Sequence, residues 1–125
     1  MLRYDPLKAP VPHEWTALHE AKRIRLVQDY HQKARIRLPN TKAHAIFHVI
    51  VENQIAVGDQ LPIQRTVQRL MDEGLNRHDA IHAIGMVLAE HISNLVQIPE
   101  PQPSNPNDPY FAAIEELTAE KWLRG

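Results

Sequence analysis

Apolar residues recur along the chain at the three-and-four spacing of helices, and almost nowhere do they alternate as in strands. Proline, glycine and capping residues divide this pattern into helical segments. Pro12 suits a first helical position, and Gly58 suits the residue after a helix end. Asn76 is placed to cap a helix that Pro99 ends. We therefore predict an all-α fold with helices over residues 12–36, 41–58, 62–74, 77–98 and 109–123.

The stretch PEPQPSNPNDP is rich in proline and cannot pack a core, so it is interpreted as a connector. We predict a small helical bundle of four main helices plus a C-terminal helix on a proline-rich tether. The predicted units are a core domain over residues 1–98, a connector over 99–108 and the C-terminal helix over 109–125. That helix packs either on the core or on a second subunit, and the second option predicts a homodimer.

Two histidine pairs at spacing four raise the question of a metal site. His44, His48 and Glu52 fall on one stripe of a helix that is otherwise apolar nearly all round. Such a helix is central, so its polar stripe needs hydrogen bonds or a ligand. His78 and His82 lie along one edge of the apolar stripe of the fourth main helix, and that edge can face the first pair.

We therefore predict a metal or small-ligand site between the second and fourth main helices. The candidate ligands of a divalent metal, Zn or Fe, are His44, His48, Glu52, His78 and His82. Glu52 is either a ligand or an acceptor that orients one. Two further residues are candidates for pairing with the ligands or for holding an anion, Arg77 and Asp79.

The alternative interpretation is a non-catalytic interaction protein, in which the same histidines and Glu52 form a buried hydrogen-bond network without a metal. The tethered C-terminal helix would then make the dimer or partner contact. The remaining four histidines are interpreted as surface or helix-end residues: His13, His19, His31 and His91.

Composition narrows the chemistry further. The 14 basic and 15 acidic residues give a net charge of -1, so no overall field favours nucleic acid or an anionic membrane. The chain has no cysteine, which excludes thiolate zinc sites, iron–sulfur clusters and disulfides. The longest uncharged apolar-rich run, residues 43–51, is too short to cross a bilayer, and the start has no apolar signal region. We expect a cytoplasmic protein without a membrane partner.

The stretch RTVQRLMDEGLNRHDAIHAIG imitates a helix-turn-helix. Its second helix would offer Arg77, His78 and His82 to a DNA groove. Asp79 beside them would repel phosphate, so we do not expect nucleic acid as a partner.

Five stretches resemble a bacterial family called domain of unknown function 1841: YDPLKAP, RIRLVQDYH, LPNTKAHAIFHVIVENQIAVGD, RLMDEGLNRHDAIHAIGMVLAEH and YFAAIEELTAEKW. The match covers nearly the whole chain in the same order. The resemblance implies a small, cytoplasmic, mostly helical bacterial protein, and it supplies no catalytic residues. Met86 departs from the family pattern, in which a smaller or more polar residue is expected, and this argues against position 86 as a ligand.

Overall fold

The prediction of an all-α fold is confirmed. The computed structural model describes residues 3–36, 40–97 and 107–124, and these contain helices and no strand. None of these helices is both long and apolar enough to span a membrane. The helices are α1 (Pro12–Thr16), α2 (Glu20–Lys33), α3 (Thr41–Val57), α4 (Ile63–Asp72), α5 (Arg77–Gln97), α6 (Asp108–Glu116) and α7 (Ala119–Arg124).

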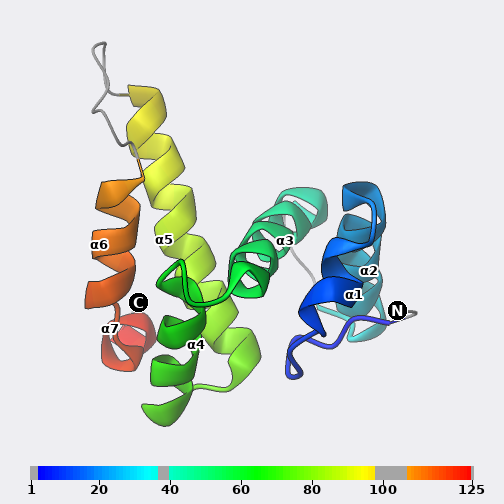
Figure 1. Cartoon of the computed structure of the whole chain (residues 1–125), viewed down its shortest axis with the longest axis horizontal. Coiled ribbons are helices and arrows are strands. Elements are labelled where there is room, and N and C mark those ends of the chain that lie inside the picture. Colours follow the sequence, from blue (N-terminus) through cyan, green and yellow to red (C-terminus); the bar gives the residue numbers. More distant parts are fainter. Residues whose placement is uncertain (1–2, 37–39, 98–106, 125) are drawn as a thin grey trace.

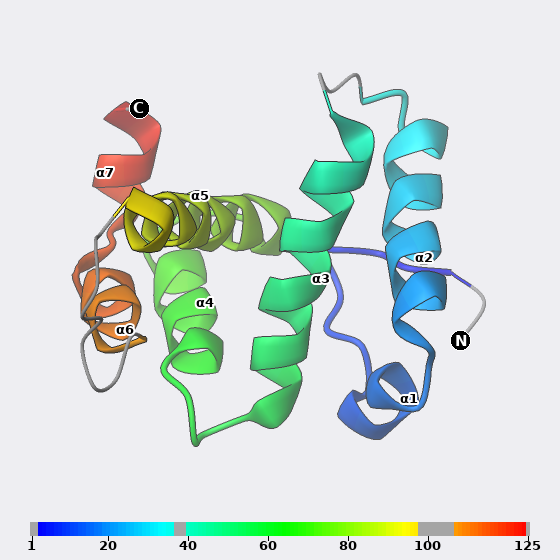
Figure 2. The same cartoon turned by 90° about the horizontal axis from the view of Figure 1, so that it is seen from above.

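Helix α3 occupies the middle of the molecule. It packs beside α2 on one side, and on the other side it meets the first turns of α5 (Figures 1 and 2). Helices α4 and α6 lie along α5, so the C-terminal half forms a small bundle of its own helices. This arrangement places the beginning of α5 against the side of α3, where both helices carry histidine pairs.

The two flanks of α3 explain why it is apolar nearly all round. Ala45 and Val49 pack with Trp15 and α2 in one hydrophobic cluster. Val51 packs in a second cluster with α4, α5 and the C-terminal helices. Because apolar side chains of α3 are buried on both sides, its remaining polar stripe lies between the two clusters.

The first predicted helix is divided into two, and the prediction of one continuous helix over residues 12–36 is wrong. The chain leaves the helical conformation after Thr16 and resumes it at Glu20. Arg23 donates hydrogen bonds to the carbonyl of Thr16 at 2.8 Å and to that of Leu18 at 3.1 Å. These bonds satisfy carbonyls that an uninterrupted helix would have bonded internally.

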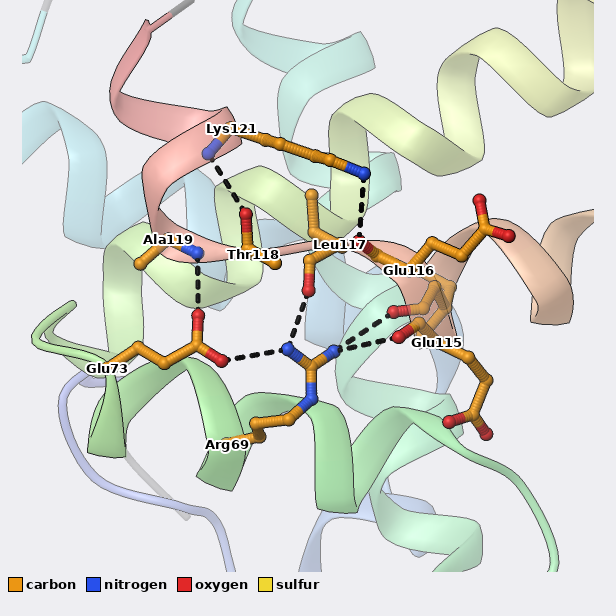
Figure 3. Close-up of polar contacts among 9 residues, drawn as sticks. Arg69, Glu73, Glu115, Glu116, Leu117, Thr118, Ala119 and Lys121 are labelled. Carbon is orange, nitrogen blue, oxygen red and sulfur yellow. Dashed lines mark hydrogen bonds and ion pairs between the residues drawn. The ribbon is translucent and has the colours of Figure 1, made fainter.

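The last predicted helix is divided in the same way, into α6 and α7 (Figure 3). Arg69 of α4 donates to the carbonyls of Leu117 at 2.6 Å and Ile114 at 3.3 Å. Glu73 accepts from the backbone N–H of Ala119 at 2.8 Å, at the start of α7. Arg69 of α4 and Glu73, the residue that follows α4, thus bond to the end of one helix and the start of the next.

The C-terminal helices pack on their own chain. Tyr110, Ile114 and Ala119 are buried in the cluster that α4 and α5 form. The residues predicted as a connector lie mostly outside the described residues, which resume at residue 107.

We expect Arg69→Ala to destabilise the protein by about 1–3 kcal/mol, because it leaves the carbonyl groups at the end of α6 without their charged donor. Urea denaturation measures this loss. Arg65→Ala is the matched control on the same helix, since Arg65 makes an exposed ion pair with Glu115 and should change stability by at most about 1 kcal/mol. Equal effects of the two substitutions would contradict the role given to Arg69.

Candidate metal centre

Four histidines from three helices converge where α2, α3 and the start of α5 meet. His31 is in the last turn of α2, His48 is in the middle of α3, and His78 and His82 are in the first two turns of α5. Each offers one ring nitrogen, and these four nitrogens all lie within 4.8 Å of one another. We call these four residues the histidine cluster.

Hydrogen bonds fix the tautomer of His31. Its Nδ1 lies 2.8 Å from the carbonyl oxygen of Val27, which can only accept. His31 Nδ1 therefore carries the proton, and its Nε2 carries a lone pair. The Nε2 of His44 lies 3.2 Å from His31 Nε2 and donates its proton to this lone pair.

A second chain of hydrogen bonds fixes the tautomer of His48. The Tyr4 hydroxyl donates to Glu52 Oε2 and lies 3.0 Å from His48 Nδ1. Burial, followed by the charge of Glu52, raises the pKa of Tyr4 well above its ordinary value, so the phenol keeps its proton. Because that single proton is directed to Glu52, His48 Nδ1 must donate to the Tyr4 oxygen. The lone pair of His48 is therefore on Nε2.

Buried ring nitrogens without partners mark this cluster. The Nε2 atoms of His48, His78 and His82 are shielded from solvent, and none has a hydrogen-bond partner among the described residues. A buried polar group without a partner costs about 1–3 kcal/mol. Three such atoms on neighbouring side chains are unusual for a folded protein, and together they could hold an ion.

Glu52 is connected to the cluster through the hydroxyl of Tyr4, which contacts both Glu52 and His48. Its two oxygens accept from Arg77 at 2.7 and 2.8 Å, and the pair is buried, with exposed fractions of 1% for Glu52 and 5% for Arg77. Arg77 also donates to the carbonyl of Pro6 at 2.9 Å. The carboxylate thus reaches His48 through Tyr4, in the way that hydrogen-bonded carboxylates orient metal-binding histidines.

The structure places the other predicted residues differently. His44 is not among the four mutually close ligands, although it donates to His31. Among the residues that the structure describes, no hydrogen bond joins the Asp79 carboxylate to the cluster, and the backbone N–H of Asp79 donates to Asn76 Oδ1 at 2.8 Å. Because Arg77 is buried and paired with Glu52, it is not presented to a DNA groove as the helix-turn-helix interpretation required.

Two histidines that were interpreted as surface or helix-end residues are buried. His31 is 2% exposed and belongs to the cluster, and His91 is 8% exposed and stacks on Tyr110. The position of His31 carried a signal, since it follows Val27 by four residues and so shares its buried face. Tyr4 lies in an extended segment without periodicity, and no sequence signal pointed to it.

Burial favours the neutral form of three histidines of the cluster, His48, His78 and His82. Burial, followed by the charges of the neighbouring histidines, lowers the pKa of His78 and of His82 from 6.5 to about 4. The same causes lower the pKa of His44 to about 4 and that of His48 well below its ordinary value. Neutral imidazole is the form that ligates metals, so these side chains are ready to bind an ion at neutral pH.

We expect the chelator-treated protein to lose stability as the pH falls from 6.5 towards 4. In the unfolded chain these histidines take up protons near pH 6.5, whereas the folded protein resists protonation down to about pH 4. The stability they confer is therefore complete above pH 6.5 and is lost below it, by at most about 1.4 kcal/mol per pH unit for each histidine. Urea midpoints between pH 7.5 and 4.5 measure the slope.

His82→Asn should reduce this slope by nearly the contribution of one histidine. His13→Asn, at an exposed position, should leave it unchanged. A stability that is flat across this pH range would contradict the expected burial of the cluster.

Comparisons of the chain with protein-family models, with curated proteins and with solved structures found no match. The resemblance to the domain of unknown function 1841 therefore stays a prediction, and the proposals below rest on the geometry of the site.

Proposed function

We propose that this protein binds one divalent transition-metal ion, Zn²⁺ or Fe²⁺, through His31, His48, His78 and His82. The proposal is carried by two observations: each of the four histidines has a ring nitrogen within 4.8 Å of the others, and the Nε2 atoms of three of them are buried without partners. Imidazole nitrogen suits both ions, and the chain offers no thiolate that would compete.

The spacing of the nitrogens is compatible with such an ion. Zinc–nitrogen bonds of about 2.0–2.1 Å in a tetrahedral site separate the nitrogens by about 3.3 Å. Four nitrogens 4.8 Å apart would each lie about 2.9 Å from their centre, so the rings need to move inward by at most about 1 Å. The bonds of His31 to Val27 and of His48 to Tyr4 already orient both lone pairs.

The alternative function is a non-catalytic interaction protein whose histidines are structural. The bonds among Tyr4, Glu52 and Arg77 favour it, because they form a satisfied buried network without any ion. That network does not account for the buried nitrogens of His48, His78 and His82. A homodimer through the C-terminal helix and a cytoplasmic location stay predictions under either function.

The experiment that tests the proposal is elemental analysis by plasma mass spectrometry. Untagged protein is incubated with Zn²⁺, or with Fe²⁺ under anaerobic conditions, and is then freed of unbound ions. We expect about one ion per chain, and we expect His48→Ala and His82→Ala to lose it. His91→Ala is the matched control, because its Nε2 is also buried without a partner but lies against Tyr110, outside the cluster.

Tyr4→Phe separates the metal site from a purely structural network. It keeps the ring and removes only the hydroxyl that joins His48 to Glu52, so metal affinity measured against a competing chelator should fall by about 10–100-fold. Protein that takes up no ion, or that keeps the ion in both His48→Ala and His82→Ala, would overturn the proposal.

A further inference from the structure

A small cavity opens beside the histidine cluster. Its volume is about 270 Å³, and its walls come from α3, α5 and α7. Two imidazoles line one part of it, and apolar side chains line most of the remainder. The lining residues are His44, Phe47, His82, Gly85, Met86, Ala89 and Trp122.

Gly85 keeps this cavity open. It follows His82 by three residues on α5, so both lie on the same face of the helix. A Cβ atom built at Gly85 meets no other atom within 4 Å. A larger side chain therefore fits the backbone at this position, and it would fill the cavity next to His82.

His44 gives the cavity a hydrogen-bond donor. Its Nε2 donates to the lone pair of His31, and that lone pair can serve either His44 or a metal ion. When an ion binds His31, the N–H of His44 is released. Because His44 also lines the cavity, the released donor is available to a molecule bound there.

Charge favours an anion at this place. Four neutral imidazoles leave the two positive charges of a divalent ion uncompensated. The Glu52 carboxylate is not a counter-charge for the ion, since Arg77 neutralises it through two hydrogen bonds. An anionic donor that reaches the ion from the cavity would balance part of this charge in a buried environment, where charge pairs are strongest.

We propose that the cavity binds a small carboxylate with an apolar tail. One carboxylate oxygen joins the four imidazoles as a fifth ligand, so that the ion changes from four- to five-coordinate. The other oxygen accepts from His44, and the tail contacts Phe47, Met86 and Trp122. The volume suits a molecule of roughly ten non-hydrogen atoms, below the range of drug-sized pockets. This inference rests on the proposed metal site.

The test is titration calorimetry of zinc-loaded protein with phenylacetate and with acetate. Acetate offers the same carboxylate without the ring. We expect phenylacetate to bind at least about tenfold more tightly than acetate, because the ring buries apolar surface in the cavity. Chelator-treated protein should bind neither. Gly85→Leu should abolish the preference while keeping one zinc ion per chain.

Asn94→Leu is the control, since it places the same side chain on an exposed part of α5 away from the cavity. It should leave the preference intact. Zinc-loaded protein that binds the two acids equally would contradict the proposed binding of a carboxylate in the cavity, and so would a Gly85→Leu variant that keeps the preference. Neither result would contradict the proposed metal site. Protein that takes up no zinc would overturn both.

Discussion

Arg77→Met should lower the free energy of unfolding by about 3–5 kcal/mol at pH 7. The substitution keeps an apolar stem of similar length and removes the guanidinium that makes two hydrogen bonds to Glu52 and one to Pro6. The carboxylate of Glu52 then stays buried without its counter-charge, which is the costly way to break a buried ion pair. Folded proteins are typically stable by only about 5–15 kcal/mol, so this loss would be a large part of the total. Urea denaturation followed by circular dichroism measures it.

A double-mutant cycle tests whether the loss comes from the uncompensated charge. Glu52→Gln removes the carboxylate charge, and the combination Glu52→Gln with Arg77→Met should cost less than the sum of the two single substitutions. Arg65→Met, which breaks an exposed ion pair, should cost at most about 1 kcal/mol. A loss below 1 kcal/mol for Arg77→Met, or strict additivity in the cycle, would contradict the energetic role of the buried pair.

Zn²⁺ should raise the thermal midpoint of the protein by roughly 10–15 °C. At a free concentration about 1,000 times the dissociation constant, an ion that binds only the folded state stabilises it by about 4 kcal/mol, which corresponds to such a shift for a chain of this length. Calorimetric scans in excess chelator and in excess Zn²⁺ measure the difference. Mg²⁺ should leave the midpoint unchanged, because it requires oxygen ligands.

Two variants test whether the rise in thermal midpoint comes from zinc bound at the histidine cluster. His48→Ala should remove the response to Zn²⁺, whereas His91→Ala should retain it, since His91 lies against Tyr110 and away from the cluster. A shift below about 2 °C in the unaltered protein would contradict tight binding of zinc, and an equal shift in His48→Ala would show that the zinc is held elsewhere.

Local signals in the sequence predicted the central helix well. Asn40 caps α3 by accepting from the N–H of Ala43 at 3.0 Å, and Gly58 follows its last residue with φ +86°, a conformation that suits glycine. The division of the first and last helices was not predictable in this way. Those breaks depend on Arg23 and Arg69, whose side chains bond to carbonyls that no periodicity or capping pattern brings to them.

The part of the candidate site that could be predicted from the sequence is the set of histidines that helical spacing places on one face of a helix. His78 and His82 share one face of α5 and meet His48 of α3, as the four-residue spacing indicates. His31 was missed because its approach depends on how α2 packs against α3. Tyr4 was missed because an extended segment has no pattern that shows which element it contacts.

The network around Glu52 has a consequence for how the chain folds during its synthesis. Tyr4 and Glu52 emerge from the ribosome well before Arg77, which is 71 residues after Pro6 and 25 after Glu52. Until Arg77 arrives, the N-terminal half would have to bury a carboxylate without its counter-charge, and that is unfavourable. We therefore expect Glu52 to stay in contact with water while the chain is nascent. The bonds of Arg77 to Glu52 and Pro6 form only after the beginning of α5 has left the exit tunnel.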